Sequence, residues 1–327
     1  MSVDGPHRPA ATKQENEMAS KQSLANKFHY ETLAAVGSKE PMSPEENIEW
    51  NERHWPALTA EPRGVDYIEA DAGLIPSMWI VPKGTTEDHV IFYSHGGGFV
   101  GGSIYTHRKM VGHLAKAVGC RALIFDYPYA HQRKYPAQLD AAFAAYNWLL
   151  DQGVSAEHIA AAGDSSGAIL TFGILQRGRE HGLPLPSAVM TISGWLDMAL
   201  TGASYETNRT KDLFFAKEAV AWLVSNMLGE SGDRRDPLAS PLYADFTGLP
   251  PIYLQAGADE TLVDESRMLA EKARQAGVEV RLEVFPQMLH SFQMMAGHAP
   301  EADDAIARLA EWVRPKLGLD DKQPKVG

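Results

Sequence analysis

Cysteine is almost absent from this chain, which has a single one, Cys120, among its 327 residues. A lone cysteine can form no disulfide within the chain, and it excludes the paired cysteines of a zinc finger or ribbon. Cys120 stands beside the apolar run 122–125. We therefore interpret it as a buried structural thiol and not as a reactive group.

Basic clusters and long apolar runs are absent as well. The net charge of −12 argues against non-specific binding to nucleic acid. No stretch approaches the roughly 18 consecutive apolar residues of a membrane-spanning helix, and residues 1–20 lack the apolar segment of a secretory signal. No HExxH, EF-hand or Walker loop occurs, so neither a metal nor a nucleoside triphosphate is implied. We expect a cytoplasmic protein that binds no nucleic acid and spans no membrane.

Strand-like and helix-like segments alternate along most of the chain. The first two strand-like segments alternate in polarity and predict antiparallel edge strands, whereas most later ones are continuous apolar runs, typical of strands buried on both faces. Strands are predicted at 65–70, 77–81, 90–94, 122–125, 159–162, 188–192, 251–255 and 280–285, and helices at 108–118, 138–151, 168–181, 265–276 and 302–314. This order predicts an α/β fold with a mostly parallel sheet and helices on both faces.

Composition divides the chain into five parts. Residues 1–21 are polar and predict a disordered tail, residues 22–60 predict amphipathic helices, and residues 319–327 form a second tail. Residues 61–318 carry the α/β pattern. Within them, residues 198–237 contain no strand signal but an apolar helical stretch. We expect this insertion and the N-terminal helices to form a cap over the sheet.

Ser165 lies in the strongest local motif, Gly163-Asp164-Ser165-Ser166-Gly167, which follows a predicted strand and opens a predicted helix. A serine in this position sits on a sharp, strained turn that exposes its hydroxyl. The N–H of Ser166, at the helix N-terminus, can face a developing oxyanion. The alternative interpretation is an ordinary glycine-serine turn that caps a helix.

A second motif, His95-Gly96-Gly97-Gly98-Phe99, follows the first buried strand. Its glycines let the backbone approach a ligand closely and present N–H groups to it. We predict an oxyanion hole formed by Gly97, Gly98 and Ser166, with His95 holding the loop by hydrogen bonds.

The same loop also fits a dinucleotide-binding pattern. Gly96, Gly98 and Gly101 satisfy G-x-G-x-x-G, and Asp126 ends the next strand, where a ribose-binding acid would stand. That interpretation leaves the serine motif and the later acid and histidine unexplained.

Asp259 and His290 each follow a late predicted strand. An aspartate at the carboxyl end of a parallel strand can orient a histidine, and a histidine there can act as the general base for a serine. Asp264 is the alternative orienting acid. The order Ser165, Asp259, His290 is typical of α/β-hydrolases, and we predict these three residues as a catalytic triad.

Together the two glycine motifs resemble those of the hormone-sensitive-lipase-like (bacterial family IV) carboxylesterases. Further similarity lies in Asp126-Tyr127, Tyr135-Pro136-Ala137, Ser240-Pro241-Leu242 and Leu249-Pro250-Pro251, and the resemblance covers about 65–316. It implies the α/β-hydrolase fold, with an eight-stranded core and a helical cap, and ester hydrolysis without a cofactor. It also implies a homodimer. Residues 240–264 are similar to monoterpene ε-lactone hydrolases, which adds lactones to the expected substrates.

The sequence departs from the family pattern in two places. Ser166 and Ala168 stand where the family usually has alanine and glycine. The stretch 127–132 lacks the usual arginine and glutamate, which puts the supporting network of that loop in doubt. Neither departure removes a catalytic group.

Aromatic residues of the expected cap predict a pocket for a small or medium-sized apolar substrate. The predicted substrate-binding residues are Phe99, Trp195, Phe214, Phe215 and Trp222, and further candidates for the pocket wall are Trp50, Trp55 and Met227. Two alternatives to ester hydrolysis stay open. The same triad can cleave amides or carbamates, and the same fold can serve as a non-catalytic receptor for small molecules.

Overall fold

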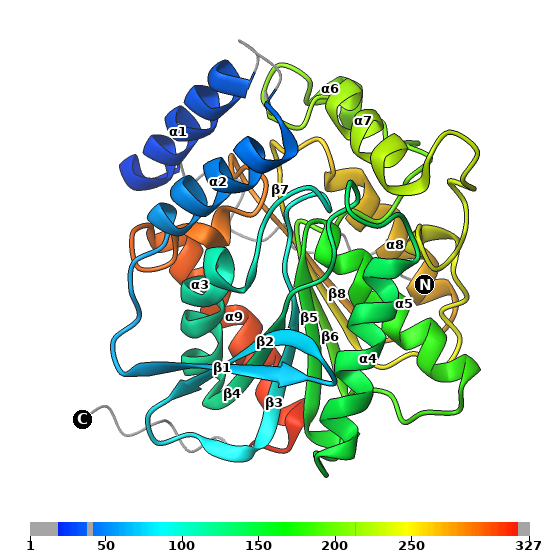
Figure 1. Ribbon diagram of the computed structural model, residues 1–327. Coiled ribbons are helices and arrows are strands. Elements are labelled where there is room, and N and C mark those ends of the chain that lie inside the picture. Colours follow the sequence, from blue (N-terminus) through cyan, green and yellow to red (C-terminus); the bar gives the residue numbers. More distant parts are fainter. Residues whose placement is uncertain (1–18, 38–41, 213, 320–327) are drawn as a thin grey trace, which may run out of the picture.

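The computed structural model describes residues 19–37, 42–212 and 214–319. Most of the predicted tails, residues 1–18 and 320–327, lie outside these ranges. The described part contains one eight-stranded sheet with the order β1-β2-β4-β3-β5-β6-β7-β8 (Figure 1). The sequence therefore predicted the fold class correctly.

Every predicted strand is present. The strands are β1 (Val65–Ala72), β2 (Ile75–Pro82), β3 (Thr86–Ser94), β4 (Cys120–Phe125), β5 (Ile159–Asp164), β6 (Ala188–Ile192), β7 (Ile252–Gly257) and β8 (Val280–Phe285). The pairs β1–β2 and β2–β4 are antiparallel, and all other neighbours are parallel. The central strand β5 is buried at every position, as its continuous apolar pattern predicts.

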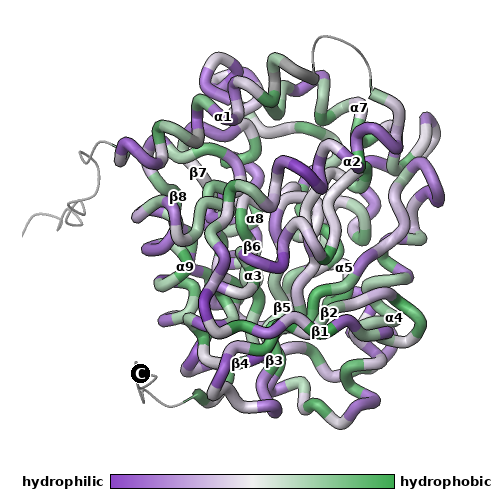
Figure 2. Tube along the Cα trace, turned by 60° about the vertical axis from the view of Figure 1, so that its left-hand side comes forward, coloured by the Kyte–Doolittle hydropathy of each residue, from purple (hydrophilic) through white to green (hydrophobic). Residues whose placement is uncertain are grey.

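Helices cover both faces of the sheet. On one face lie α3 (Ile104–Val118) and α9 (Pro300–Val313), and on the other lie α4 (Ala137–Asp151), α5 (Ser166–Glu180) and α8 (Val263–Gln275). Along α9, hydrophobic and hydrophilic residues alternate in bands (Figure 2). The hydrophobic bands correspond to the side that α9 buries against the sheet.

The boundaries of α3 follow from its capping residues. Ser103 accepts hydrogen bonds from the N–H groups of Tyr105 and Thr106, at 3.1 and 3.2 Å, which satisfies donors that the first turn cannot pair. Gly119 ends the helix in the left-handed conformation, with φ of 81°. These two caps place the start of α3 directly after the glycine loop 96–102.

Five segments form the cap of the molecule: α1 (Lys21–Gly37), α2 (Pro44–His54), the 3₁₀ turn η2 (Trp55–Leu58), α6 (Ser204–Thr207) and α7 (Lys217–Leu228). They lie together beyond the ends of the central strands (Figure 1). Ser20 and Ser23 donate side-chain hydrogen bonds to Glu301, which fastens the start of α1 to α9. The remaining 3₁₀ turns are η3 (Ala156–His158), η4 (Pro241–Tyr243), η5 (Phe292–Met295) and η6 (Arg314–Leu317).

Among the described residues, no helix has the length and apolar character needed to cross a membrane. Cys120 is fully buried at the start of β4, as predicted for a structural thiol. Burial raises the pKa of its thiol to about 12.

Candidate active site

Ser165 lies at the sharp turn between β5 and α5. Its backbone has φ of 51° and ψ of −124°, a conformation that side chains rarely adopt. A Cβ on Gly163 would stand 2.7 Å from the carbonyl oxygen of Gly167, and a Cβ on Gly167 would overlap the carbonyl oxygen of Ser94. Only glycine fits at these two positions, so the sequence pattern follows from the geometry of the turn.

The side chain of Asp164 supports this turn. Its Oδ1 accepts hydrogen bonds from the N–H of Gly96 and the hydroxyl of Tyr93, both at 2.9 Å, and its Oδ2 lies 3.3 Å from Nε2 of His107. Burial alone would raise the pKa of Asp164, but His107, Tyr93 and His95 outweigh it and hold that pKa below its ordinary value. The buried carboxylate therefore ties the glycine loop to the serine turn.

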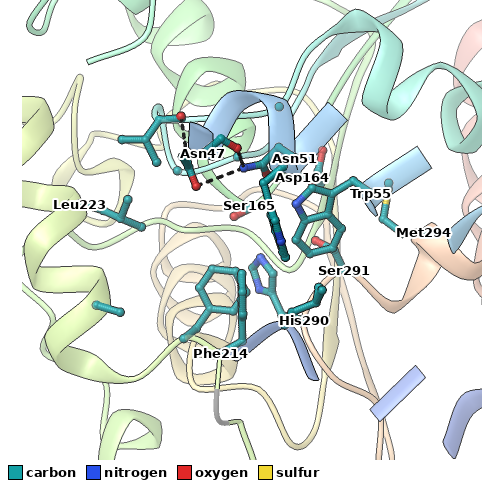
Figure 3. Close-up of a pocket in the computed structure, with 18 of the residues that line it drawn as sticks. Asn47, Asn51, Trp55, Asp164, Ser165, Phe214, Leu223, His290, Ser291 and Met294 are labelled. Atoms are coloured by element: carbon teal, nitrogen blue, oxygen red, sulfur yellow. Dashed lines mark hydrogen bonds between the residues drawn. The ribbon is translucent and has the colours of Figure 1, made fainter. Parts of the chain in front are cut away.

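His290 lies in the loop after β8 and lines the same cavity as Ser165 (Figure 3). Three contacts hold it. Its carbonyl oxygen accepts a hydrogen bond from the hydroxyl of Tyr30 at 2.5 Å, its ring centroid lies 4.1 Å from that of Phe215, and its neighbour Ser291 donates its N–H to Ser193 Oγ at 2.8 Å. The imidazole is thus buried between the cap and the sheet.

The acid that faces His290 is Glu260, and the predicted pairing with Asp259 is wrong. Oε2 of Glu260 lies 3.3 Å from Nδ1 of His290, and both side chains are buried. Asp259 turns the other way and pairs with Nζ of Lys211 at 3.0 Å near the surface. The alternative acid, Asp264, bonds to Arg267 and to the N–H of Ser204.

Asp259 and Glu260 are neighbours in the turn that follows β7, and their side chains point to different sides: Glu260 faces His290 and Asp259 faces Lys211. The motif Gly257-Ala258-Asp259-Glu260 contains both candidates. Which one turns inward depends on contacts from the distant insertion. Asn208 donates its side-chain amide to the carbonyl oxygens of Ala258 and Glu260, at 2.9 and 2.8 Å, and sets the direction of the turn.

Glu260 is fully buried, and burial raises its pKa above the ordinary value of 4.5, although His290 and Ser193 act in the opposite direction. A buried carboxylate beside Nδ1 favours the tautomer that leaves Nε2 free to accept a proton. Glu260 therefore lies close enough to His290 to orient its imidazole.

The three N–H groups predicted to form an oxyanion hole differ in their hydrogen bonding. Within the described part of the chain, no hydrogen bond uses the N–H of Gly97, which lines the cavity, or that of Ser166, which directly follows Ser165. The N–H of Gly98 is not free, because it donates to Oγ of Ser166 at 2.9 Å. Two of the three predicted donors are thus open in this structure.

A cavity of about 400 Å³ opens above Ser165. Its wall contains the predicted residues Phe214, Phe215 and Trp222, together with Trp50 and Trp55. Further lining residues that the sequence did not indicate are Leu33, Met42, Val100, Ala216, Ala219, Leu223 and Met294. The cavity is therefore mainly apolar, and the cap forms most of it.

Three aromatic or apolar candidates lie elsewhere. Phe99 and Trp195 are buried outside the cavity wall, with ring centroids 6.2 Å apart, and Phe99 also packs against Tyr127. Met227 is buried in the core on the inner side of α7. The prediction of Phe99 and Trp195 as substrate-binding residues is wrong for this cavity, because both rings are buried in the core and neither residue lines its wall.

Two asparagines give the cavity a polar side that sequence reasoning missed. Asn47 donates its amide to the carbonyl oxygen of Val100 at 2.8 Å, and Asn51 donates to the carbonyl oxygen of Asn47 at 2.7 Å (Figure 3). The first bond joins α2 to the glycine loop, and the second lies within α2. The four-residue spacing of the two asparagines on a helix was the available signal.

No group of three or more potential metal ligands occurs among the residues that the structure describes. Asp126, the candidate ribose-binding acid, accepts a hydrogen bond from the N–H of Ile104 at 2.9 Å and so caps α3. His95 stacks on Tyr127 with ring centroids 4.2 Å apart, and its Nδ1 lies 2.7 Å from the carbonyl oxygen of Gly96. Both residues therefore have structural contacts of their own.

Comparisons with known proteins give consistent results. A family model described as the alpha/beta hydrolase fold matches residues 91–294. The chain is 37% identical over 231 residues to an esterase of Acinetobacter venetianus, covering 71% of this chain and 76% of that protein. It is 35% identical over 246 residues to an acetyl-hydrolase of Streptomyces hygroscopicus, covering 75% and 82%.

Solved structures agree with these sequence matches. The crystal structure of an esterase from the bacterial hormone-sensitive lipase family superposes with a TM-score of 0.87 at 38% identity, over 92% of this chain and 100% of that one. The range of the family model, residues 91–294, includes Ser165, Glu260 and His290.

Proposed function

The chain belongs to the hormone-sensitive-lipase-like α/β-hydrolases and hydrolyses esters, and we propose that it does so through an acyl-enzyme formed on Ser165. The observation that carries this proposal is the pairing of buried His290 with buried Glu260 beside the cavity into which Ser165 opens. Nucleophile, base and orienting acid are the parts that a two-step acyl transfer requires.

In the first step, Oγ of Ser165 attacks the ester carbonyl carbon while Nε2 of His290 takes the hydroxyl proton. Glu260 holds Nδ1 and stabilises the imidazolium that forms. The carbonyl oxygen becomes an oxyanion, which the N–H groups of Gly97 and Ser166 stabilise. Collapse of the tetrahedral intermediate expels the alcohol, which receives its proton from His290.

In the second step, water attacks the acyl group on Ser165. His290 removes a proton from the water, and the same N–H groups stabilise the second oxyanion. The acid is released, and Ser165 regains its proton. Each step uses groups that the fold already holds in place.

The cavity supports a substrate with a small or medium-sized apolar part. Its volume of about 400 Å³ and its aromatic wall suit short and medium acyl chains better than long ones. A lactone presents the same carbonyl carbon to Ser165 as an open-chain ester does. We therefore include lactones in the proposed substrate range.

A panel of p-nitrophenyl esters, from acetate to palmitate, and of small lactones tests this proposal. We expect a maximum of kcat/KM at short or medium acyl chains. Phe214→Ala should move that maximum towards longer chains, because Phe214 forms part of the cavity wall. A folded wild-type protein that cleaves no ester or lactone would refute the proposal and favour the receptor alternative. Matched amides and carbamates in the same panel would identify the other alternative.

A further inference from the structure

Ser166 places a hydroxyl group directly beside the proposed oxyanion hole. The side chain is fully buried at the first position of α5, next to the nucleophile. Its Oγ accepts the N–H of Gly98 at 2.9 Å, and this N–H is one of the three predicted oxyanion donors. An alanine in this position would have no atom to accept that bond.

The hydroxyl of Tyr127 has a hydrogen-bond partner of its own in this region. Tyr127 donates its hydroxyl proton to the carbonyl oxygen of His95 at 2.8 Å. Burial raises the pKa of Tyr127 well above its ordinary value, so the phenol keeps this proton. The single Tyr127 proton is thus already used and is not donated to Ser166. The Ser166 oxygen thus remains an acceptor for Gly98.

Gly98 has little room to turn away from this contact. A Cβ on Gly98 would stand 2.9 Å from the side chain of Leu223 in α7, so the cap packs tightly against this face of the loop. The adjacent turn is closed by the carbonyl oxygen of Gly97, which accepts the N–H groups of Val100 and Gly101 at 3.1 and 3.0 Å. These contacts keep the Gly98 N–H beside Ser166 in the free enzyme.

We propose that the Ser166 hydroxyl competes with the oxyanion for the N–H of Gly98. In the free enzyme this N–H donates to Ser166, and when the oxyanion forms it donates to the oxyanion instead. This inference rests on the proposed function. The neutral carbonyl of a bound substrate gains nothing by displacing one neutral acceptor with another. An oxyanion forms a stronger, charge-assisted bond and displaces the hydroxyl.

The exchange therefore acts on the transition state and not on substrate binding. Breaking the hydrogen bond between Gly98 and Ser166 costs about the net free energy of one hydrogen bond. This cost is added to the activation barrier and slows the chemical step by roughly twofold to tenfold. In the empty enzyme the same bond satisfies a buried donor and stabilises the loop. Ser166 thus lowers kcat and raises the melting temperature.

The test is Ser166→Ala, compared with the wild type on p-nitrophenyl butyrate. We expect kcat to rise roughly twofold to tenfold with KM unchanged, and the melting temperature to fall. The inhibition constant of 1-butaneboronic acid should fall by the same factor, because the tetrahedral adduct of this compound resembles the oxyanion. Ser166→Cys, with a weaker acceptor, should give a smaller gain in the same direction.

Ser187→Ala is the matched control, because it removes a hydroxyl that donates to the carbonyl oxygen of Ile159 at the opposite end of the sheet. It should leave kcat and the boronate affinity unchanged. A kcat of Ser166→Ala that is equal to or below that of the wild type, without tighter boronate binding, overturns the inference. An inactive wild type refutes the proposed function and this inference together, whereas an active wild type with a slower Ser166→Ala refutes this inference alone.

Discussion

Replacing Glu260 by glutamine tests which acid supports the base. The side chain keeps its size but loses its charge, so His290 loses the partner that stabilises its protonated form in the transition state. At 3.3 Å between Nδ1 and Oε2, and with an effective dielectric constant of about 20, that interaction is about 5 kcal/mol. Because each 1.36 kcal/mol is tenfold in rate, we expect kcat to fall by about 10³ to 10⁴.

The matched control is Asp259→Asn, the same acid-to-amide change one residue earlier. Asp259 pairs with Lys211, which is about half exposed, and surface pairs of this kind contribute at most about 1 kcal/mol. We expect kcat within about threefold of the wild type. Both variants should remain folded, because Glu260→Gln removes a carboxylate whose pKa burial raises and so creates no new buried charge.

The assay is steady-state hydrolysis of p-nitrophenyl butyrate at pH 7.5, with circular dichroism to compare melting temperatures. A large loss in Asp259→Asn together with a mild effect in Glu260→Gln would refute the assignment of Glu260. It would show that the loop rearranges in solution to bring Asp259 to His290.

Three further predictions follow from buried groups. Tyr30→Phe removes the hydroxyl that donates to the carbonyl oxygen of His290, and kcat on the same ester should fall roughly threefold to tenfold; an unchanged kcat would show that α1 does not position the base. Asp164 has a lowered pKa, so its contribution to stability is present above its ordinary value of 3.8 and is lost as the pH falls through the lower folded value. Asp164→Asn should therefore melt well below the wild type at pH 7, and the difference between their melting temperatures should narrow in scans below about pH 4; a constant difference would contradict this. Because burial raises the pKa of Cys120 to about 12, Ellman's reagent should find no thiol in the native protein at pH 8 and one in guanidinium; rapid native labelling would contradict it.

Much of the fold was predictable from the sequence because burial on two faces leaves a simple pattern. The continuous apolar runs of β3 and β5 identify central strands, and the glycines around Ser165 identify the turn that only they permit. His290 was predictable because β5 and β8 are parallel, so the loop after β8 leaves the same edge of the sheet as the turn after β5. These features depend on local chemistry and on chain order.

The errors have a different origin. The choice between Asp259 and Glu260, and the direction of Phe99 and Trp195, depend on contacts between segments far apart in the sequence. Asn208 in the insertion holds the turn that carries Asp259 and Glu260, and Ser166 accepts the N–H of Gly98. Neither contact leaves a periodic pattern, so no reading of composition or spacing could have found it.

Covalent labelling with a fluorophosphonate tests the central claim most directly. The reagent phosphonylates an activated serine and mimics the tetrahedral intermediate in the oxyanion hole. We predict one adduct per chain, located by peptide mass spectrometry on Ser165, with esterase activity lost in proportion to labelling and no adduct on Ser165→Ala. A label on another residue, or full activity after Ser165 is labelled, would contradict the account.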